Sequence, residues 1–170
     1  MNRMLSILFA APIVLAASPQ SDRDAIIRQN ERLSRAFERN DFRVWDRIMA
    51  DGLRDYAPDG TSFGKAFMLK MGKRERSWAL PPVRTEMRYS RVQVHGNRGT
   101  AHGDETTCYT VKLRRGGRAP LCYTQSSNDE WRKVKGEWKL TAMHDQDDQR
   151  FTLSGKPISH EQFRKVVGLQ

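Results

Sequence analysis

Apolar and polar positions follow two different patterns along the chain. In the first half, apolar residues over 23–39 recur at the spacing of one face of an amphipathic helix, and a shorter helix is expected around Trp45. Residues 52–57 then read as a strand, and a third helix is expected over 63–74. The first half is therefore predicted to hold three helices and one strand.

Beyond Pro81-Pro82 the pattern changes to short runs rich in Val, Thr, Tyr and Trp, separated by turns that contain Gly. Such runs are typical of consecutive antiparallel strands. The four expected strands cover 84–95, 99–113, 119–134 and 137–145. Ser159 can begin one more short helix. Helices followed by a meander of strands predict an α+β fold, with the helices packed on one face of a curved sheet.

The N-terminus, residues 1–17, has the pattern of a signal peptide. Arg3 precedes an apolar run from Met4 to Leu15, and the small residues Ala16 and Ala17 follow. The run is shorter than the roughly 18 apolar residues that a transmembrane helix needs, and a proline interrupts it. We therefore expect export, with cleavage after Ala16 or Ala17.

The remainder, residues 18–170, has the length of one domain, with a core over about 23–148 and a C-terminal extension over 149–170. No other segment approaches a membrane span, so a soluble periplasmic or secreted protein is expected. The whole chain has a net charge of +10, which can indicate an anionic partner. Its longest basic runs are only the pairs Lys73-Arg74 and Arg114-Arg115. Dispersed charge favours an ordinary solvated surface over a nucleic-acid interface.

Cys108 and Cys122 are the two cysteines of the chain. An even number of cysteines in an exported protein favours a disulfide. A hairpin that turns at Arg115-Gly116 places the two residues directly opposite each other on neighbouring strands, where a bond can form. The alternative is a pair of buried free thiols.

Two segments resemble a known family. The stretch AIIRQNERLSRAFERNDFRVWDRIMADGLRDYAPDGTSFGKAFML resembles the opening of NTF2-like domains of the SnoaL-like and DUF4440 type. WRKVKGEWKLTAMH, with Trp131 and Trp138 on either side of a Gly turn, resembles their closing hairpin. The resemblance implies a cone-shaped α+β fold, in which N-terminal helices and a strongly bent antiparallel sheet enclose a pocket. It implies no single activity, because the family includes isomerases, cyclases, hydrolases and binding proteins.

Strand alternation predicts the face of the sheet that lines this pocket. A second hairpin is expected to turn at Lys135-Gly136. The pairs expected across it are Trp131 with Leu140, Asp129 with Ala142, and Ser127 with His144. The residues predicted to face inward are Glu105, Thr107, Tyr109, Tyr123, Gln125, Ser127, Asp129, Trp131, Leu140, Ala142 and His144. The two cysteines fall on the opposite face. A β-bulge would reverse the face of the residues beyond it.

The candidate catalytic residues on this face are Asp129, His144 and Glu105. A carboxylate near His144 can serve as a general base, and a Tyr can stabilise a developing oxyanion. The alternative, which we favour, is a polar cavity whose side chains bind a ligand or pair with one another. Tyr56 is expected at the mouth of the pocket, whereas Asp59 fits the turn Pro58-Asp59-Gly60.

No sequence motif indicates a cofactor or a metal. The histidines His95, His102, His144 and His160 lack ligand spacing, and the acidic residues after His144 fit a solvated loop. Three hypotheses remain. The chain binds a small molecule or peptide in its cone-shaped cavity, or it is an enzyme of the ketosteroid-isomerase or cyclase-like type using acid–base chemistry there, or it is an interaction module that dimerises through its sheet.

Overall fold

The computed structural model describes residues 19–113 and 116–167. The predicted signal peptide, Ser18 and the pair Arg114-Arg115 lie outside these residues. The helices are α1 (Pro19–Glu38), α2 (Phe42–Ile48), α3 (Lys65–Trp78) and α4 (His160–Val167). The strands are β1 (Met49–Tyr56), β2 (Ser62–Gly64), β3 (Leu80–His95), β4 (Arg98–Lys112), β5 (Arg118–Val134), β6 (Glu137–Asp145), β7 (Arg150–Leu153) and β8 (Lys156–Ile158).

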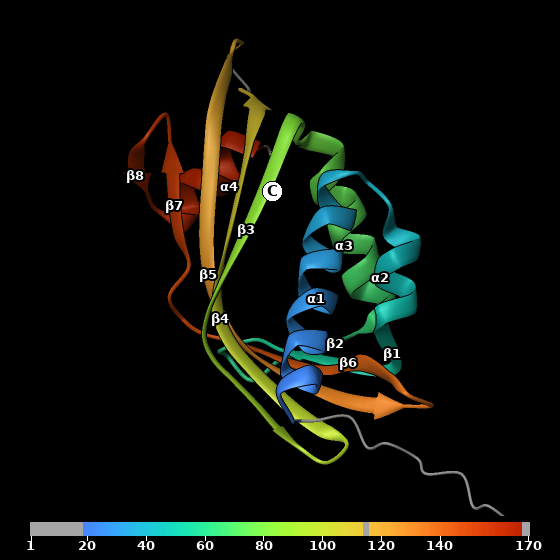
Figure 1. Cartoon of the computed structure of the whole chain (residues 1–170). Coiled ribbons are helices and arrows are strands. Elements are labelled where there is room, and N and C mark those ends of the chain that lie inside the picture. The colour runs from blue at the N-terminus through green and yellow to red at the C-terminus, as the bar shows by residue number, and fades with distance from the viewer. Residues whose placement is uncertain (1–18, 114–115, 168–170) are drawn as a thin grey trace, which may run out of the picture.

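All described strands belong to one mixed sheet with the order β2-β1-β6-β5-β4-β3, and β7 pairs with both β5 and β8. Neighbours are antiparallel except β1 and β6, which are parallel. Figure 1 shows that the long strands β3, β4 and β5 bend, and that α1, α2 and α3 lie on the concave side of the sheet. The predicted α+β fold with helices on one face of a bent sheet is thus confirmed.

The elements differ from the sequence prediction mainly at their ends. The first helix begins at Pro19 rather than at 23, because proline is well tolerated in the first turn of a helix. The third helix continues past 74 to Trp78 and ends shortly before Pro81-Pro82, where proline disfavours helical backbone. The strands β2, β7 and β8 were not predicted. Among the described residues, no helix is long and apolar enough to cross a membrane.

The hairpin of β4 and β5 has the predicted register. Its pairs run without interruption from Arg98 opposite Arg132 to Lys112 opposite Arg118. Cys108 lies opposite Cys122, and the two form a disulfide with their Cα atoms 4.1 Å apart. Since side chains alternate between faces, the disulfide lies on the face of the sheet that points away from the helices.

The pairing of β5 with β6 follows the prediction only near the turn. Trp131 lies opposite Leu140 as predicted, but the register shifts by one residue between Glu130 and Trp131. Beyond this shift the pairs are Glu130 with Ala142, Asp129 with Met143, Asn128 with His144, and Ser127 with Asp145. The predicted pairs of Asp129 with Ala142 and of Ser127 with His144 are therefore wrong. A β-bulge puts an extra residue into one strand and so reverses the faces beyond it.

Strand β5 changes partner along its length. Its residues 121–124 pair with β7, and its residues 127–134 pair with β6. At the change, the Ser126 N–H donates to Asp148 Oδ1 at 3.1 Å, and the Gln146 N–H donates to the Ser126 carbonyl oxygen at 3.0 Å. These bonds hold the segment that leads from β6 to β7. The C-terminal strands and α4 are thereby placed beside the concave face of the sheet.

Two apolar clusters fill most of the space between the helices and the sheet. The first cluster consists of Ile26, Ile48, Met49, Leu53, Val92, Ala101, Trp131, Trp138 and Leu140. The second cluster consists of Phe37, Phe42, Ala79, Val83, Tyr109, Val111, Leu121, Phe151 and Phe163. Both clusters include inward-facing side chains of the central strands β4, β5 or β6. The same face of the sheet therefore packs against two separate apolar clusters.

Candidate functional site

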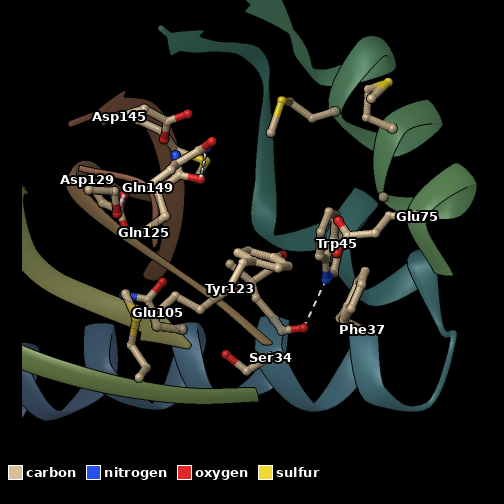
Figure 2. Close-up of a pocket in the computed structure, with 18 of the residues that line it drawn as sticks. Ser34, Phe37, Trp45, Glu75, Glu105, Tyr123, Gln125, Asp129, Asp145 and Gln149 are labelled. Carbon is tan, nitrogen blue, oxygen red and sulfur yellow. Dashed lines mark hydrogen bonds between the residues drawn. The ribbon is translucent and has the colours of Figure 1, made fainter. Parts of the chain in front are cut away.

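A cavity of about 390 Å³ is bounded by residues of both apolar clusters and lined by side chains from helices and strands. Leu140 of the first cluster and Phe37 of the second both line it. Helices α1, α2 and α3 form one wall, and the inward face of β3 to β6 forms the other (Figure 2). Phe151 of β7 and Phe163 of α4 complete the enclosure. This volume falls in the range of small-molecule sites, which cover about 300–1,000 Å³.

The structure brings six of the residues predicted to face inward into the cavity wall. They are Glu105, Tyr123, Gln125, Ser127, Asp129 and Leu140. All except Leu140 come from the hairpin of β4 and β5, whose register was predicted correctly. Figure 2 shows Asp129, Gln125 and Asp145 on one side of the cavity, with the ring of Tyr123 between them and Glu75.

Two other predicted residues face inward but do not line the cavity. Trp131 is 1% exposed and belongs to the first apolar cluster. Tyr109 is buried behind the wall, where its hydroxyl donates to Glu75 Oε1 at 3.3 Å. The expected alternation therefore holds for both, although packed side chains separate them from the open space.

His144 and Tyr56 lie on the opposite face of the sheet, so their predicted places in the pocket are wrong. The bulge between β5 and β6 turns His144 outward, where its ring stacks on Tyr56 with centroids 4.8 Å apart. Its Nε2 lies 3.1 Å from Glu130 Oε1. The same shift turns Met143 and Asp145 inward, and both line the cavity. The anticipated pairing of Asp129 with His144 does not form.

The residues missed by the sequence prediction come largely from the helices and the C-terminal segment. Glu75 and Trp78 extend α3 beyond its predicted end and line the cavity. The signal was present, since Met68, Met71 and Glu75 recur at helical spacing. Continuing that spacing past 74 would have identified the one carboxylate on an otherwise apolar helical face.

Each of three cavity carboxylates accepts a hydrogen bond from a neutral hydroxyl group. The Ser127 hydroxyl donates to Asp129 Oδ1 at 2.9 Å, and the Thr107 hydroxyl donates to Glu105 Oε1 at 3.3 Å. Glu75 accepts from Tyr109, as described above. No Lys or Arg is found among the described residues that line the cavity.

Burial raises the pKa of the carboxyl groups in this cavity. It raises the pKa of Asp129 to about 7 and that of Glu75 to about 7, because the charged form loses its hydration. The neighbouring carboxylate of Glu105 raises both pKa values further, whereas the hydroxyl bonds lower them. The pKa values of Glu105 and Asp145 are raised as well, chiefly by burial. The cavity therefore holds carboxyl groups that exchange protons near neutral pH.

The site shows no arrangement typical of a metal centre. Within residues 19–113 and 116–167, no group of three or more His, Cys, Asp or Glu side chains is placed to hold a metal ion. The polar side chains on the described wall of the cavity carry carboxyl groups, amides, hydroxyls and the imidazole of His160.

The sequence matches no protein-family model and no curated protein. Its structure is similar to a conserved protein from Planctomyces limnophilus, with a TM-score of 0.64 and 19% identity over 74% of this chain and 94% of that one. It is also similar to an NTF2-like superfamily protein from Salmonella enterica, with a TM-score of 0.59 and 14% identity over 75% and 91% of the two chains. A type 2 hexachlorocyclohexane dehydrochlorinase gives a TM-score of 0.60 and 12% identity over 83% and 91%.

These similarities confirm the fold that the two sequence segments predicted. The finer resemblance to DUF4440-type members stays a prediction, as does the division into a core and a C-terminal extension. The chain has the NTF2-like fold.

Proposed function

We propose that this chain is an exported protein that binds a small organic molecule in the cavity between its helices and its sheet. The observation that carries the proposal is the cavity of about 390 Å³ with a largely apolar and aromatic wall. Polar groups are gathered in a few places on that wall, which is the usual composition of a small-molecule site. The space is too small for more than a short piece of a peptide.

Export is supported by two features. The N-terminal residues, which lie outside the described part of the chain, have the charged, apolar and small-residue pattern of a signal peptide. The Cys108–Cys122 disulfide is of the kind that persists in oxidising compartments. Dimerisation through the sheet stays a prediction.

A neutral fluorescent probe tests the binding function. N-phenyl-1-naphthylamine should bind at one saturable site, with increased fluorescence. The substitution Ser34→Phe places a ring in the cavity, because Ser34 is a buried residue of its wall, and should weaken binding at least about 10-fold. The matched control is Ser77→Phe, on the exposed side of α3, which should bind like the unmodified protein. Equal binding by both variants, or no saturable binding at all, would contradict the proposal.

A second candidate function is acid–base catalysis in the same cavity. It is favoured by the pKa of Asp129, which is near 7 and so suits proton transfer at neutral pH. A protonated Glu75 can donate a hydrogen bond to a developing oxyanion. One similar structure is a dehydrochlorinase, so the fold can support an enzyme.

Deuterium exchange at carbon tests this second function. The protein should accelerate exchange of the α-hydrogens of 4-phenyl-2-butanone in heavy water, followed by nuclear magnetic resonance. Asp129→Asn should remove the acceleration, because the amide cannot accept the proton as a base. The control Glu130→Gln changes a carboxyl group on the outer face and should leave the rate unchanged. An equal rate in the Asp129→Asn variant would exclude Asp129 as the base.

A further inference from the structure

The carboxyl groups of the cavity come from four different elements. Glu75 is on α3, Glu105 on β4, Asp129 on β5 and Asp145 on β6, and all four line the same space. Such convergence is not the solvated face of one helix or strand, because the groups come from one helix and three neighbouring strands and line the same cavity. Buried carboxylates are normally paired with a cation or a set of donors.

The described part of the chain supplies no cation for these groups. The neighbour of Glu75, Arg76, donates instead to the carbonyl oxygens of Ala79 at 2.7 Å and Glu38 at 3.4 Å. The nearest titratable nitrogen in the wall belongs to His160, whose ring stacks on Phe151 with centroids 5.5 Å apart. The negative charge that the cavity can develop is therefore left uncompensated by its own wall.

The wall also retains unused hydrogen-bonding capacity. Asn30 is 5% exposed and lines the cavity, and its Nδ2 makes no hydrogen bond of normal geometry among the described residues, although its side chain interacts with the Tyr89 hydroxyl. Asp129 accepts one hydroxyl bond, although a carboxylate offers about four acceptor positions. A buried polar group without a partner costs stability, so the open acceptor positions of Asp129 are placed to meet a donor group of a ligand.

Aromatic rings surround the Glu75 side of the cavity. Figure 2 shows Glu75 beside the rings of Trp45, Phe37 and Tyr123. The rings of Phe37 and Trp45 are stacked, with centroids 5.9 Å apart, and the Trp45 indole N–H is fixed by donating to the Leu33 carbonyl oxygen at 2.9 Å. The faces of such rings attract organic cations, and they pack equally well against alkyl or aryl groups.

We propose that the ligand of this cavity is an organic cation, namely an amine with an aromatic or alkyl body. Its ammonium group pairs with the inward carboxylates, and its body packs against the rings of Trp45, Phe37 and Tyr123. The inference rests on the proposed binding function, since it concerns the same cavity. It selects a cation over an anion or a neutral molecule, because only the cation compensates carboxylates that the chain leaves unpaired.

Competition with the fluorescent probe tests the charge of the ligand. Three compounds of similar size are compared at about pH 8, where Asp129 and Glu75, with pKa values of about 7, are mostly ionised: 2-phenylethylamine, 2-phenylethanol and 3-phenylpropionate. The amine should displace N-phenyl-1-naphthylamine with a Kd at least about 10-fold lower than the alcohol, and the anion should bind weakest. The amine should also release protons on binding near pH 7, measured by calorimetry in two buffers, because a bound cation lowers the pKa of the carboxyl groups.

The pH dependence of the preference for the amine over the alcohol is an independent test of the charge of the ligand. Towards about pH 5 Asp129 and Glu75, whose pKa values burial raises to about 7, become protonated, so the advantage of the amine over the alcohol should shrink. The titratable groups that face the four cavity carboxyl groups are Asp55, Tyr89, Tyr109, Tyr123, Asp148 and His160. His160 is the only basic side chain among them. The titration is therefore repeated with His160→Asn, in which the shrinkage should persist.

Matched variants assign the effect to the inward carboxyl groups. Glu75→Gln and Asp129→Asn should each reduce the preference for the amine about 10-fold while leaving the affinity for the alcohol unchanged. The control Glu130→Gln, on the outer face, should have no effect. If the probe binds but the amine is no better than the alcohol, the charge inference fails and the binding function stands. If neither the probe nor any of the three compounds binds, both fail.

Discussion

The inward face of β5 has two neighbouring parts that are packed differently: a filled end around Trp131, and a cavity end from Tyr123 to Asp129. Trp131 and Asp129 are two positions apart on one face, and they are 1% and 3% exposed. Around Trp131 the space is filled by the first apolar cluster, whereas Asp129 borders an open cavity. Alternation along a strand therefore fixes which way a side chain points, but the elements packed opposite decide whether it meets a core or a void.

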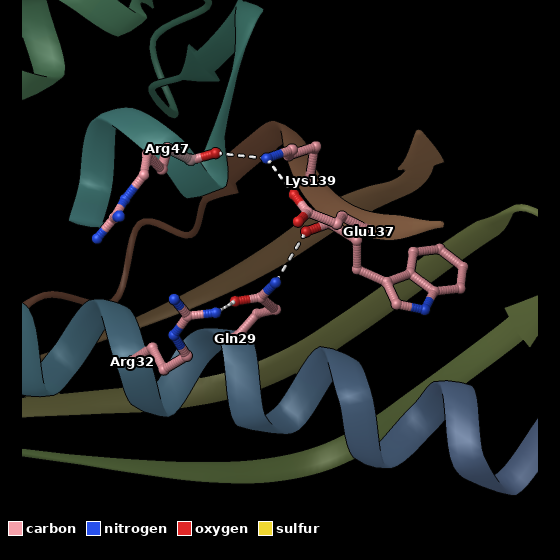
Figure 3. Close-up of polar contacts among 6 residues, drawn as sticks. Gln29, Arg32, Arg47, Glu137 and Lys139 are labelled. Carbon is pink, nitrogen blue, oxygen red and sulfur yellow. Dashed lines mark hydrogen bonds and ion pairs between the residues drawn. The ribbon is translucent and has the colours of Figure 1, made fainter. Parts of the chain in front are cut away.

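Polar bonds tie the helices to the sheet at the filled end. Gln29 of α1 donates to the Trp138 carbonyl oxygen at 3.3 Å, and the Lys139 ammonium group donates to the Arg47 carbonyl oxygen at 2.8 Å (Figure 3). Asp22 accepts from Lys133 at 2.6 Å, and this bond lowers the pKa of Asp22. The helices are also bonded to the sheet at the cavity end, since the Thr85 N–H donates to Glu38 Oε1 at 2.7 Å and the Tyr109 hydroxyl donates to Glu75 Oε1 at 3.3 Å. Residues of α3 and α4 border the open space there.

Removing the central side chain of the filled end should have the largest effect on stability. Trp131→Ala leaves a void in a closed core and should lower the free energy of unfolding by about 3–5 kcal/mol in urea denaturation. The control Val134→Ala, at an exposed position of the same strand, should change it by about 0.5 kcal/mol or less. If Trp131→Ala lowered the free energy of unfolding as little as Val134→Ala does, the filled end would not be the packed core.

Opening the disulfide should have the next largest effect and should separate stability from binding. The double variant Cys108→Ser, Cys122→Ser releases a loop of about 15 residues and should lose about 3 kcal/mol of unfolding free energy. Because the bond lies on the outer face, binding of N-phenyl-1-naphthylamine by the folded variant should be unchanged. Loss of probe binding at a temperature where the variant is folded would contradict this separation.

A substitution at the cavity end should have the smallest effect on stability, and the size of this effect should depend on pH. Asp129 has a pKa near 7 in the folded protein against about 3.8 for the ordinary side chain, so the folded state holds the proton more tightly. The stability that Asp129 contributes is complete below about pH 4, falls as the pH rises to about 7, and is constant above that. Asp129→Asn should therefore stabilise the protein by on the order of 1–3 kcal/mol at about pH 8 and leave it unchanged at about pH 4.

Thermal unfolding of the two proteins across this pH range measures the difference. The other cavity carboxyl groups also make the stability depend on pH. The variant is therefore compared with the unmodified protein at each pH. A stabilisation of equal size at both ends of the range would show that Asp129 is not a buried acid with a raised pKa.

The hairpin of β4 and β5 was predictable because two independent signals fixed it. The Gly-containing turn after Arg115 and the opposition of Cys108 and Cys122 give the same register, and no bulge interrupts the ladder. The placement of Glu105, Tyr123 and Asp129 in one wall follows from that register. The general fold followed from the order of helices and strands and from the resemblance of the two segments.

The face of His144 was not predictable, because a single extra residue in β6 decides it. Nothing in the run around Thr141 resembles a turn, and a bulge depends on how two strands bend together rather than on a local residue type. Helical cavity residues such as Glu75 were missed for another reason. Their spacing was readable, but the depth and tilt of α3 against the sheet come from packing over the whole chain.

The disulfide on the outer face has a consequence for the unfolded chain. A slip of β5 by one residue against β4 would send Tyr123 and Asp129 to the outside, since strand side chains alternate. The bond between Cys108 and Cys122 cannot exist in the slipped pairing without moving the backbone. An oxidised chain that loses all its other structure therefore still holds Cys108 opposite Cys122. When it folds again, only the register that keeps Tyr123 and Asp129 on the same face as Glu105 is compatible with the bond.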